Sequence, residues 1–521
     1  MDALYQLSYR GTAIILSYLK TKRNSRLTSD SVIIINMKRD TSKKPFSIIS
    51  YFAPLGSALI FTILSCLNLR TAMWFDESYS AYLVRGDFGQ IWQMTALDVH
   101  PPFYYFCLKV WSLLFGNSDF ALRSMSVFFG GLTIILAFFL LRRWFGEKAA
   151  AISTLALSIA PIFVRYSQEM RMYALVFAII IGATLVLDIA LKSKRKAAWC
   201  AYALLVCLGM WTHYFSALAW LAQLGYIIYY FRQHGRQNSI FWVYPLAVLL
   251  YLPWLPSFFS QVKSVQSGFW IPPVDLSTPL SFFSESLVQS NAADAQSWLA
   301  LLVYALIGLS AYLLHRHTPK AARGKFGFLL AMTFVPPILL MLLSLPPLKP
   351  TYVTRYVVYS ASLLWVLVGL AIYWTWRYGK KILAAAFAAL VLISASIGLY
   401  SVTARQNNED VRGLVAVLQA HEAAPILVHV DAMSYYDFFF YESAERPIYG
   451  IDVDFVWNSL EPIRQYSQNY LSDPDSYIVQ QDRFWLVLSN DHTDDNYVFA
   501  GFRPSDSIIT DHYTATAYQK L

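Results

Sequence analysis

Two adjacent carboxylates, Asp76 and Glu77, lie in the stretch WFDESYS, which follows an apolar segment long enough to cross a membrane. A carboxylate in such a position can remove a proton from a hydroxyl group as a general base. Arginine and histidine side chains nearby would stabilise a departing phosphate, and arginine does so with a planar fork of donors. Acid–base chemistry on a phosphate-linked substrate is therefore the first hypothesis that these residues raise.

Further polar side chains flank apolar segments at the ends that we place on the same side of the membrane. They are Asp98 and His100 in LDVHPPFYY, Arg123, Glu169 and Arg171 in RYSQEMRMY, His213 and Tyr214 in THYFS, and Arg355. Singly, these are ordinary loop residues, headgroup anchors or members of a surface ion pair. Ionisable groups at membrane depth are costly and tend to mark functional cavities. Their collection on one face favours a cavity for an anionic, lipid-anchored substrate, as in glycosyl transfer from a polyprenyl phosphate sugar.

The composition indicates a polytopic α-helical membrane protein. The chain has 521 residues, of which 57% are hydrophobic and 14% charged, whereas soluble proteins carry about 25% charged residues. The apolar residues form blocks of roughly 20, the length of a membrane-spanning helix. We predict eleven spans, near residues 48–69, 123–141, 147–164, 171–191, 197–213, 215–231, 240–256, 297–314, 326–345, 356–376 and 382–400.

The segment 101–116 decides the topology, because counting it as a span would invert everything after it. It is short, begins with two prolines and contains Lys109, so we place it at the membrane surface. The predicted inner loops then carry 16 Lys and Arg in 33 residues, and the outer loops carry 9 in 111. The positive-inside rule thus puts the N-terminus in the cytoplasm and the C-terminal tail outside.

Three regions follow from this topology. Residues 1–47 form a basic cytoplasmic segment, residues 48–400 the membrane domain with a first outer loop at 70–122, and residues 401–521 an extracytoplasmic domain. The last region carries 7 Lys and Arg against 18 Asp and Glu, and alternates helical and strand patterns typical of an α/β domain. The basic charge therefore belongs to inner loops and lipid contacts, and we expect no nucleic-acid partner.

Cysteines and sequons bear on the setting. The four cysteines all lie in apolar segments, so neither a disulfide framework nor a zinc site is expected. The sequence contains no Asn-x-Ser/Thr sequon, which favours a bacterial plasma membrane over a lumenal setting.

The motifs resemble those of the GT-C membrane glycosyltransferases, in particular the protein O-mannosyltransferase-like group (family 39) and its bacterial relatives such as the aminoarabinose transferases. The resemblance covers about residues 50–415. FDE at 75–77 is similar to the Asp-Glu motif of the first outer loop, and DVHPP at 98–102 to the second motif of that loop. Arg123 matches the arginine that opens the next span, and EDVRGLVAVL resembles the junction with the outer domain.

This resemblance implies the GT-C fold and an inverting transfer of a hexose or pentose from an undecaprenyl or dolichyl phosphate donor, with no nucleotide sugar. Asp76 would be the catalytic base, and Glu77 would orient acceptor or donor groups. His100, Arg123 and either Arg171 or Arg355 would face the donor phosphate. Our predicted substrate-binding set is Asp98, His100, Arg123, Glu169, Arg171, His213, Tyr214 and Arg355.

The chain departs from the family pattern at several positions. Phe103 replaces a Leu after HPP, the nearest following Lys is Lys109, and His100 stands where the aminoarabinose transferases have Lys. The loop 257–296 is too short for a carbohydrate-binding insert, so the acceptor, whether glycan, lipid or protein, stays open. The first outer loop lacks an Asp-x-Asp triplet, and Asp98 with His213 makes a weak metal pair, so we expect no cofactor and favour metal independence.

Two other classes of function fit the sequence less well. A transporter or flippase of polyprenyl-linked sugars would also need an anion-binding cavity, but such proteins typically show internal repeats and central broken helices. The sequence shows no repeat, and the polar residues gather at one face. A structural or sensory protein would leave Asp76, His100 and Arg123 without a purpose.

The topology makes a direct prediction. A tag placed after Leu521 should be labelled in intact cells by a reagent that does not cross the membrane, because the acidic tail lies outside. A tag at the N-terminus serves as the control and should stay protected until the cells are opened. Protection of the C-terminal tag would overturn the predicted topology.

Overall fold

The structure is a computed structural model, and it describes residues 47–238, 240–267, 271–289, 305, 308, 320–404, 411–420, 425–429, 435–441, 448–451, 470–490 and 498–521. The chain divides into two units, Met1–Phe46 and Ser47–Leu521, and every described residue belongs to the second unit. The predicted basic segment 1–47 therefore lies outside the described residues, apart from Ser47.

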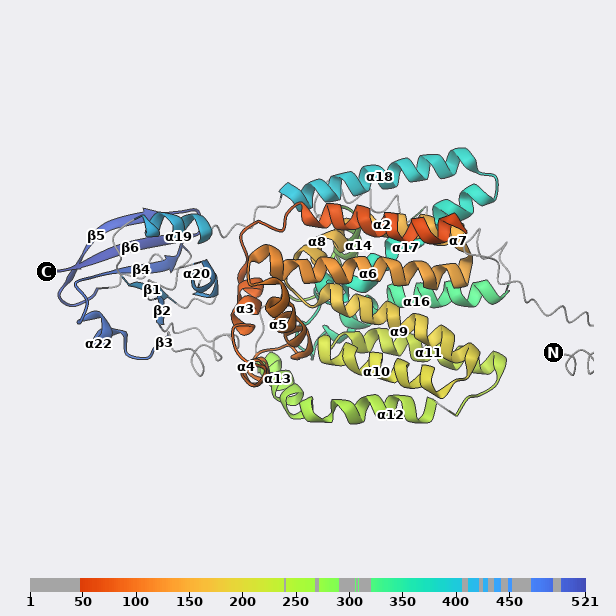
Figure 1. Cartoon of the computed structure of the whole chain (residues 1–521), viewed down its shortest axis with the longest axis horizontal. Coiled ribbons are helices and arrows are strands. Elements are labelled where there is room, and N and C mark those ends of the chain that lie inside the picture. The colour runs from red at the N-terminus through yellow and green to blue at the C-terminus, as the bar shows by residue number, and fades with distance from the viewer. Residues whose placement is uncertain are drawn as a thin grey trace, which may run out of the picture. The chain divides into compact units, whose positions relative to one another are not determined.

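Long helices dominate the described residues up to 404 (Figure 1). They are α2 (Ile48–Cys66), α6 (Asp119–Phe145), α7 (Glu147–Ser158), α8 (Pro161–Gln168), α9 (Tyr173–Ser193), α10 (Lys196–Thr212), α11 (Ser216–His234), α12 (Ile240–Tyr251), α16 (Lys320–Leu343), α17 (Val358–Arg377) and α18 (Lys381–Ala404). Shorter helices connect them: α3 (Phe75–Leu83), α4 (Phe88–Leu97), α5 (Phe103–Phe115), η2 (Leu252–Trp254), α13 (Leu255–Ser267), α14 (Thr278–Val288) and η3 (Thr354–Val357).

The protein is a multi-pass membrane protein, as the composition predicts. Within the described residues, seven helices are long and apolar enough to span a bilayer, or eight if the pair α7 and α8, bent by 57°, is one span. Ten of the eleven predicted spans coincide with helices, and α7 together with α8 accounts for 147–164. The remaining span, 297–314, lies outside the described residues except for 305 and 308.

Burial separates central helices from peripheral ones. Most of α9 and α17 is buried, whereas α2 and α18 keep large apolar side chains exposed. Exposed apolar side chains suit a lipid environment, which carries no penalty for them. Helices α17 and α7 approach each other closely, since a Cβ on Gly369 would lie 2.4 Å from the Cα of Ser153. Small residues at this crossing therefore allow α17 to pack in the middle of the bundle.

The short helices α3, α4 and α5 gather at one end of the long helices (Figure 1). Pro102 precedes α5, where proline's missing N–H costs nothing, and Asp87 with Gln90 forms a capping box at the start of α4. Helix α5 has 13 residues, too few to cross a bilayer, and exposes Leu113, Leu114 and Phe115. These features match the prediction that 101–116 is not a span.

The C-terminal part is a mixed α/β sheet, in agreement with the predicted fold class. Among its described residues, six strands lie in the order β3-β2-β1-β4-β6-β5, with parallel pairing from β3 to β4 and antiparallel pairing from β4 to β5. The strands are β1 (Ile426–His429), β2 (Ile448–Ile451), β3 (Tyr470–Leu471), β4 (Arg483–Ser489), β5 (Phe502–Ile509) and β6 (Tyr513–Lys520). The helices of this part are α19 (Val411–Gln419), α20 (Tyr435–Tyr441) and α22 (Pro474–Ile478).

Candidate active site

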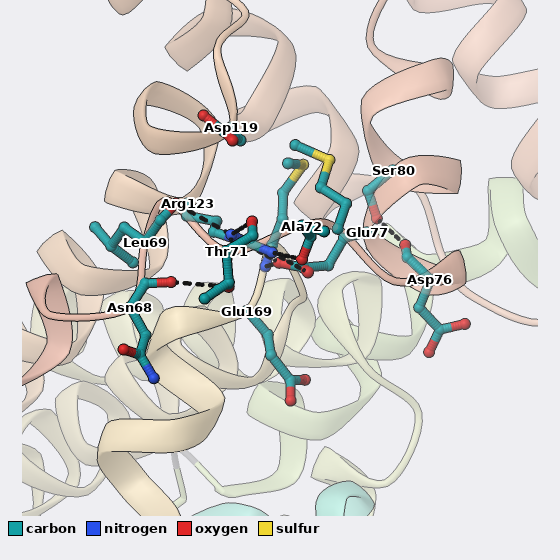
Figure 2. A network of polar contacts seen from close by, with 12 residues as sticks. Asn68, Leu69, Thr71, Ala72, Asp76, Glu77, Ser80, Asp119, Arg123 and Glu169 are labelled. Atoms are coloured by element: carbon teal, nitrogen blue, oxygen red, sulfur yellow. Dashed lines mark hydrogen bonds and ion pairs between the residues drawn. The ribbon is translucent and has the colours of Figure 1, made fainter. Parts of the chain in front are cut away.

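Helix α3 directs its two carboxylates to different sides. Consecutive residues of an α-helix are rotated by about 100°, so Asp76 and Glu77 cannot face the same surroundings. The side chain of Glu77 is 1% exposed and that of Asp76 is 20% exposed. In Figure 2 the Glu77 side chain reaches toward Arg123, whereas the Asp76 carboxylate points away from that pair. The two residues thus have separate environments despite their adjacency in sequence.

Glu77 forms a buried, two-point ion pair with Arg123. Arg123 Nε donates to Oε1 at 2.7 Å, and Nη2 donates to Oε2 at 2.6 Å (Figure 2). Glu77 Oε1 also accepts the backbone N–H of Met170 at 2.8 Å. A buried ion pair is favourable only when its geometry is good and its remaining hydrogen-bonding groups are satisfied, and both conditions hold here.

The rest of the Arg123 guanidinium holds the chain that enters α3. Its two Nη atoms donate to the carbonyl oxygens of Leu69, Thr71 and Ala72 at 2.7 to 3.1 Å. With the two bonds to Glu77, these contacts use all five N–H groups of the side chain. The structure therefore does not direct Arg123 toward an open cavity, and the expected contact with a donor phosphate finds no support in its bonds.

Asp76 lies between two guanidinium groups. Its Oδ2 atom is 3.8 Å from Arg171 Nη2 and 3.7 Å from Arg355 Nη1. Burial acts to raise the pKa of Asp76, but the charges of Arg171 and Arg355 outweigh it and lower the pKa. Asp76 is therefore ionised at neutral pH, as a general base must be. Both ion pairs are longer than hydrogen bonds, so an oxygen-bearing group can approach between these side chains.

His100 links Arg171 to Asp98. His100 Nε2 lies 3.3 Å from Arg171 Nη2, and Nδ1 lies 3.3 Å from Asp98 Oδ2. Because a guanidinium only donates, Nε2 must accept and Nδ1 must carry the proton toward Asp98. Burial and the neighbouring Arg171 lower the pKa of His100. His100 is thus a neutral orienting group for Arg171 and not a second cation.

Glu169 is a third carboxylate beside the site. Its Oε1 atom lies 3.7 Å from Arg165 Nε, and its side chain is 14% exposed. Among the described residues, no hydrogen-bond partner reaches its buried Oε2 atom. Burial raises the pKa of Glu169 to about 7 despite the opposing charge of Arg165. This carboxyl group therefore changes its charge near neutral pH.

Two of the predicted residues face different surroundings. His213 packs its ring against those of His100, Tyr173 and Tyr356, with centroids 5.4 to 6.3 Å apart, so it borders the site. The Tyr214 hydroxyl instead accepts from Trp254 Nε1 and donates to Gln261. These hydrogen bonds run toward η2 and α13 and not to the Asp76 cluster.

Lys109, the nearest lysine after the HPP motif, contacts the end of α3. Lys109 Nζ donates to the carbonyl oxygen of Val84 at 2.8 Å, at the C-terminal end of α3. A lysine at this end of a helix satisfies an otherwise unpaired carbonyl group and complements the helix dipole. Its contact is therefore structural in this chain.

A cavity adjoins the cluster on the side of Arg355. Its empty volume is about 950 Å³, including open solvent. The cavity is bounded by α8, the 272–274 segment, α14 and the chain entering η3; its lining includes Arg165, Tyr166, Glu285, Tyr352 and Arg355. Two guanidinium groups and several hydroxyl groups make it suited to a polar, anionic ligand beside Asp76.

Sequence reasoning missed three contributors to this cluster. Tyr105 OH and Ser80 Oγ lie 3.3 and 3.4 Å from Arg171 Nη1. Trp74 lies under the Arg355 guanidinium, whose Cζ is 5.4 Å from a ring centroid of Trp74. Trp74 adjoins the FDE motif and Tyr105 follows HPP closely, so proximity to the two motifs was the available signal.

The chemistry of the donor set bears on metal binding. Within the described ranges, no three His, Cys, Asp or Glu side chains gather closely enough to hold an ion. Asp98 contacts His100, whereas the metal pair considered from the sequence was Asp98 with His213. Metal independence stays a prediction.

Comparisons with known proteins identify the fold. A family model described as dolichyl-phosphate-mannose-protein mannosyltransferase matches residues 99–256. The chain is similar in structure to apo ArnT from Cupriavidus metallidurans (TM-score 0.61, 15% identity, covering 90% of this chain and 97% of that one). The same enzyme bound to undecaprenyl phosphate matches with a TM-score of 0.58 and 16% identity, covering 90% of this chain and 98% of that one. The apo oligosaccharyltransferase of Archaeoglobus fulgidus matches with a TM-score of 0.53 and 12% identity, covering 85% of this chain and 70% of that one. No curated protein sequence matches the chain significantly.

The buried pair predicts a loss of stability when one partner is removed. Arg123→Ala leaves Glu77 charged and buried, which typically costs about 3–5 kcal/mol. We expect a clearly lower midpoint of thermal unfolding for the detergent-solubilised protein, followed by intrinsic fluorescence. Arg377→Ala, which removes an exposed arginine of α17, is the control and should leave the midpoint unchanged. Equal midpoints for the two variants would contradict the structural role of Arg123.

Proposed function

The chain has the fold of the GT-C membrane glycosyltransferases, and from this premise we propose that it transfers a sugar from a polyprenyl phosphate donor to an acceptor hydroxyl. The donor class is undecaprenyl or dolichyl phosphate carrying a hexose or pentose. The acceptor is a glycan, a lipid or a protein at the outer face of the membrane. The lipid tail stays in the bilayer while the sugar phosphate occupies the cavity beside Asp76.

The proposed step moves one proton and exchanges one bond. Asp76 removes the proton of the acceptor hydroxyl, and the acceptor oxygen attacks the anomeric carbon. The bond between that carbon and the phosphate oxygen breaks, so the polyprenyl phosphate leaves with the electron pair. Attack from the side opposite the leaving group inverts the anomeric configuration. The guanidinium groups of Arg171 and Arg355 stabilise the additional charge on the departing phosphate as it develops.

One observation supports this assignment above the others. The Asp76 carboxylate is flanked by Arg171 and Arg355 at distances of 3.7 to 3.8 Å, and Arg355 also lines the adjoining cavity. The proposed base and two guanidinium groups that can bind phosphate thus lie close enough to contact one substrate. ArnT, which has the same fold, binds undecaprenyl phosphate, and this supports a lipid-phosphate donor here.

The roles of the remaining residues follow from their contacts. We assign Arg171 and Arg355 to the donor phosphate, and His100 with Asp98 to the orientation of Arg171. Glu77, with Arg123, holds α3 in place and does not contact the substrates. This assignment departs from the roles that the family resemblance implies for Glu77 and Arg123, because both side chains are buried and their hydrogen-bonding capacity is used within the protein.

A flippase of polyprenyl-linked sugars is the alternative function. It would expose an anion site to each side of the membrane in turn. The Asp76 cluster is built largely from α3, the loop before α5, the turn after α8 and the segment entering α17, all at one end of the helices. A base placed between cations at a fixed end suits transfer better than alternating access.

The setting completes the proposal. We place the protein in a bacterial plasma membrane, with the N-terminus cytoplasmic and the C-terminal sheet extracytoplasmic, on the distribution of Lys and Arg among the loops. Transfer is proposed to need no metal ion. The polar cluster and the cavity then face the compartment in which polyprenyl phosphate sugars serve as donors.

The assignment of Asp76 makes the sharpest prediction. Asp76→Asn keeps the shape of the side chain but removes the base, so we expect sugar transfer to fall at least ~100-fold. The assay presents a panel of undecaprenyl phosphate sugars to membranes that contain the native acceptors, and measures release of undecaprenyl phosphate. Asp87→Asn is the matched control, because Asn still caps α4 and the residue is exposed. Near-normal turnover by a folded Asp76→Asn protein would refute the assignment.

Glu169 predicts a pH dependence of donor binding. Its pKa of about 7 means that it is neutral below pH 7 and negative above it. A phosphodiester donor keeps one negative charge across this range, so ionised Glu169 repels it. The donor KM should therefore rise as the pH increases through 7, and should stay level between pH 6 and 8 in Glu169→Gln. A rise that persists in Glu169→Gln would assign the titration to another group.

A further inference from the structure

The C-terminal part contacts the segment that leads into α3, and we propose that Arg412 of α19 and Tyr441 of α20 are positioning residues for the base Asp76. The inference rests on the proposed function, since it assigns to these residues the placement of the catalytic helix. Neither residue touches the Asp76 carboxylate; they act on the backbone of residues 70–73.

Arg412 lies at the start of α19 and binds the chain before α3. Its Nη1 atom donates to the carbonyl oxygen of Arg70 at 2.9 Å, and its Nη2 atom donates to Asp119 Oδ2 at 2.6 Å. A longer bond of 3.4 Å joins Nη2 to the carbonyl oxygen of Thr71. Arg123, which lies in α6, donates to this same Thr71 oxygen. Two arginines from distant parts of the chain thus hold one peptide unit.

Tyr441 binds the next residues of the same segment. Its hydroxyl group accepts the backbone N–H of Met73 at 2.8 Å and lies 3.3 Å from Arg412 Nη2. The guanidinium of Arg412 also lies over the Tyr441 ring, with Cζ 5.0 Å from its centroid. Because Met73 is three residues before Asp76, a shift of this N–H moves the base directly.

Helix α20 also packs on α3 itself through Tyr436. This buried ring contacts the rings of Phe75, Tyr79 and Tyr82, with centroids 5.2 to 5.6 Å apart. Tyr79 lies within one turn of Asp76 along α3, and Tyr82 lies within two turns. Aromatic contacts of this kind have preferred geometries, so they restrict the rotation of α3 about its axis.

The start of α3 explains why such contacts are needed. Trp74 occupies the N-cap position and makes no side-chain capping bond. An uncapped helix end frays unless other groups hold it. Asn68 adds a further restraint, since its side chain donates to the carbonyl oxygens of Val402 and Thr403 at the end of α18. Residues 68–73 are thus held from α6, α18, α19 and α20 together.

Position matters more than strength in this contact. The Arg412 side chain is 43% exposed, so its ion pair with Asp119 adds little stability. A displacement of about 1 Å in a catalytic group, however, can lower a rate by about 10²-fold. Loss of these bonds should therefore reduce turnover while leaving the fold and the affinity for the donor largely intact.

The test combines hydrogen exchange with kinetics on the full chain in nanodiscs. In Tyr441→Phe and Arg412→Ala, backbone amides of residues 70–83 should exchange about fivefold faster, as expected when one or two hydrogen bonds are lost. With undecaprenyl phosphate sugars, kcat should fall about tenfold and the donor KM should change less than twofold. Arg412→Lys keeps a donor for Asp119 and should recover part of the loss in kcat.

Arg503→Ala is the matched control, because this arginine is exposed on β5 and belongs to the same sheet. It should leave both the exchange and kcat unchanged. Unchanged exchange of residues 70–83 in Tyr441→Phe and Arg412→Ala would overturn the inference, as would a loss expressed in KM alone. If the unaltered protein transfers no sugar, the proposed function fails, while the exchange measurements still decide whether Arg412 and Tyr441 hold the segment.

Discussion

The buried pair of Glu77 and Arg123 is the constraint on which the site depends. Removing two charged groups from water is expensive, and it is compensated only when every hydrogen-bonding group finds a partner. Arg123 meets this requirement by donating to Glu77 and to the carbonyl oxygens of Leu69, Thr71 and Ala72. Glu77 meets it by also accepting from the backbone N–H of Met170. The pair therefore joins α6, the entry to α3 and the turn that carries Arg171 into one rigid unit.

The pair also determines where Asp76 points. Because Glu77 is turned toward Arg123, its neighbour Asp76 on α3 faces another direction (Figure 2) and lies near Arg355, which lines the cavity. The separations differ accordingly: Glu77 lies 2.6 Å from its arginine, while Asp76 lies 3.7 to 3.8 Å from two. A short ion pair whose hydrogen-bonding groups are all used, such as Glu77 with Arg123, holds its helices in a fixed position. Longer pairs leave room for a reacting group and keep Asp76 ionised through their charge.

Local and additive signals made much of the fold predictable. Apolar length and the distribution of Lys and Arg located the helices, because each span is readable without its neighbours. Asp76, His100, Arg171 and Arg355 were also predicted as a group, since topology alone places their segments at one end. The different surroundings of Asp76 and Glu77 were not predictable, because they depend on where the side chain of Arg123 points, 46 residues away in sequence from Glu77. Tyr105 was missed because aromatic residues make up 17% of the chain and carry little information singly.

The same limitation applies to the C-terminal part, whose composition suggested a separate water-facing domain. It is acidic overall, yet the side chain that meets the entry to α3 is an arginine, Arg412, at the junction motif. The carbonyl oxygens of the segment before α3 need hydrogen-bond donors, and the Arg412 side chain supplies them despite the acidic composition of this part. Thr71, bound by arginines from α6 and α19, therefore connects the membrane helices and the C-terminal part to α3, which carries the proposed base. A sugar acceptor that engages the sheet would thus act on a structure already coupled to the proposed base.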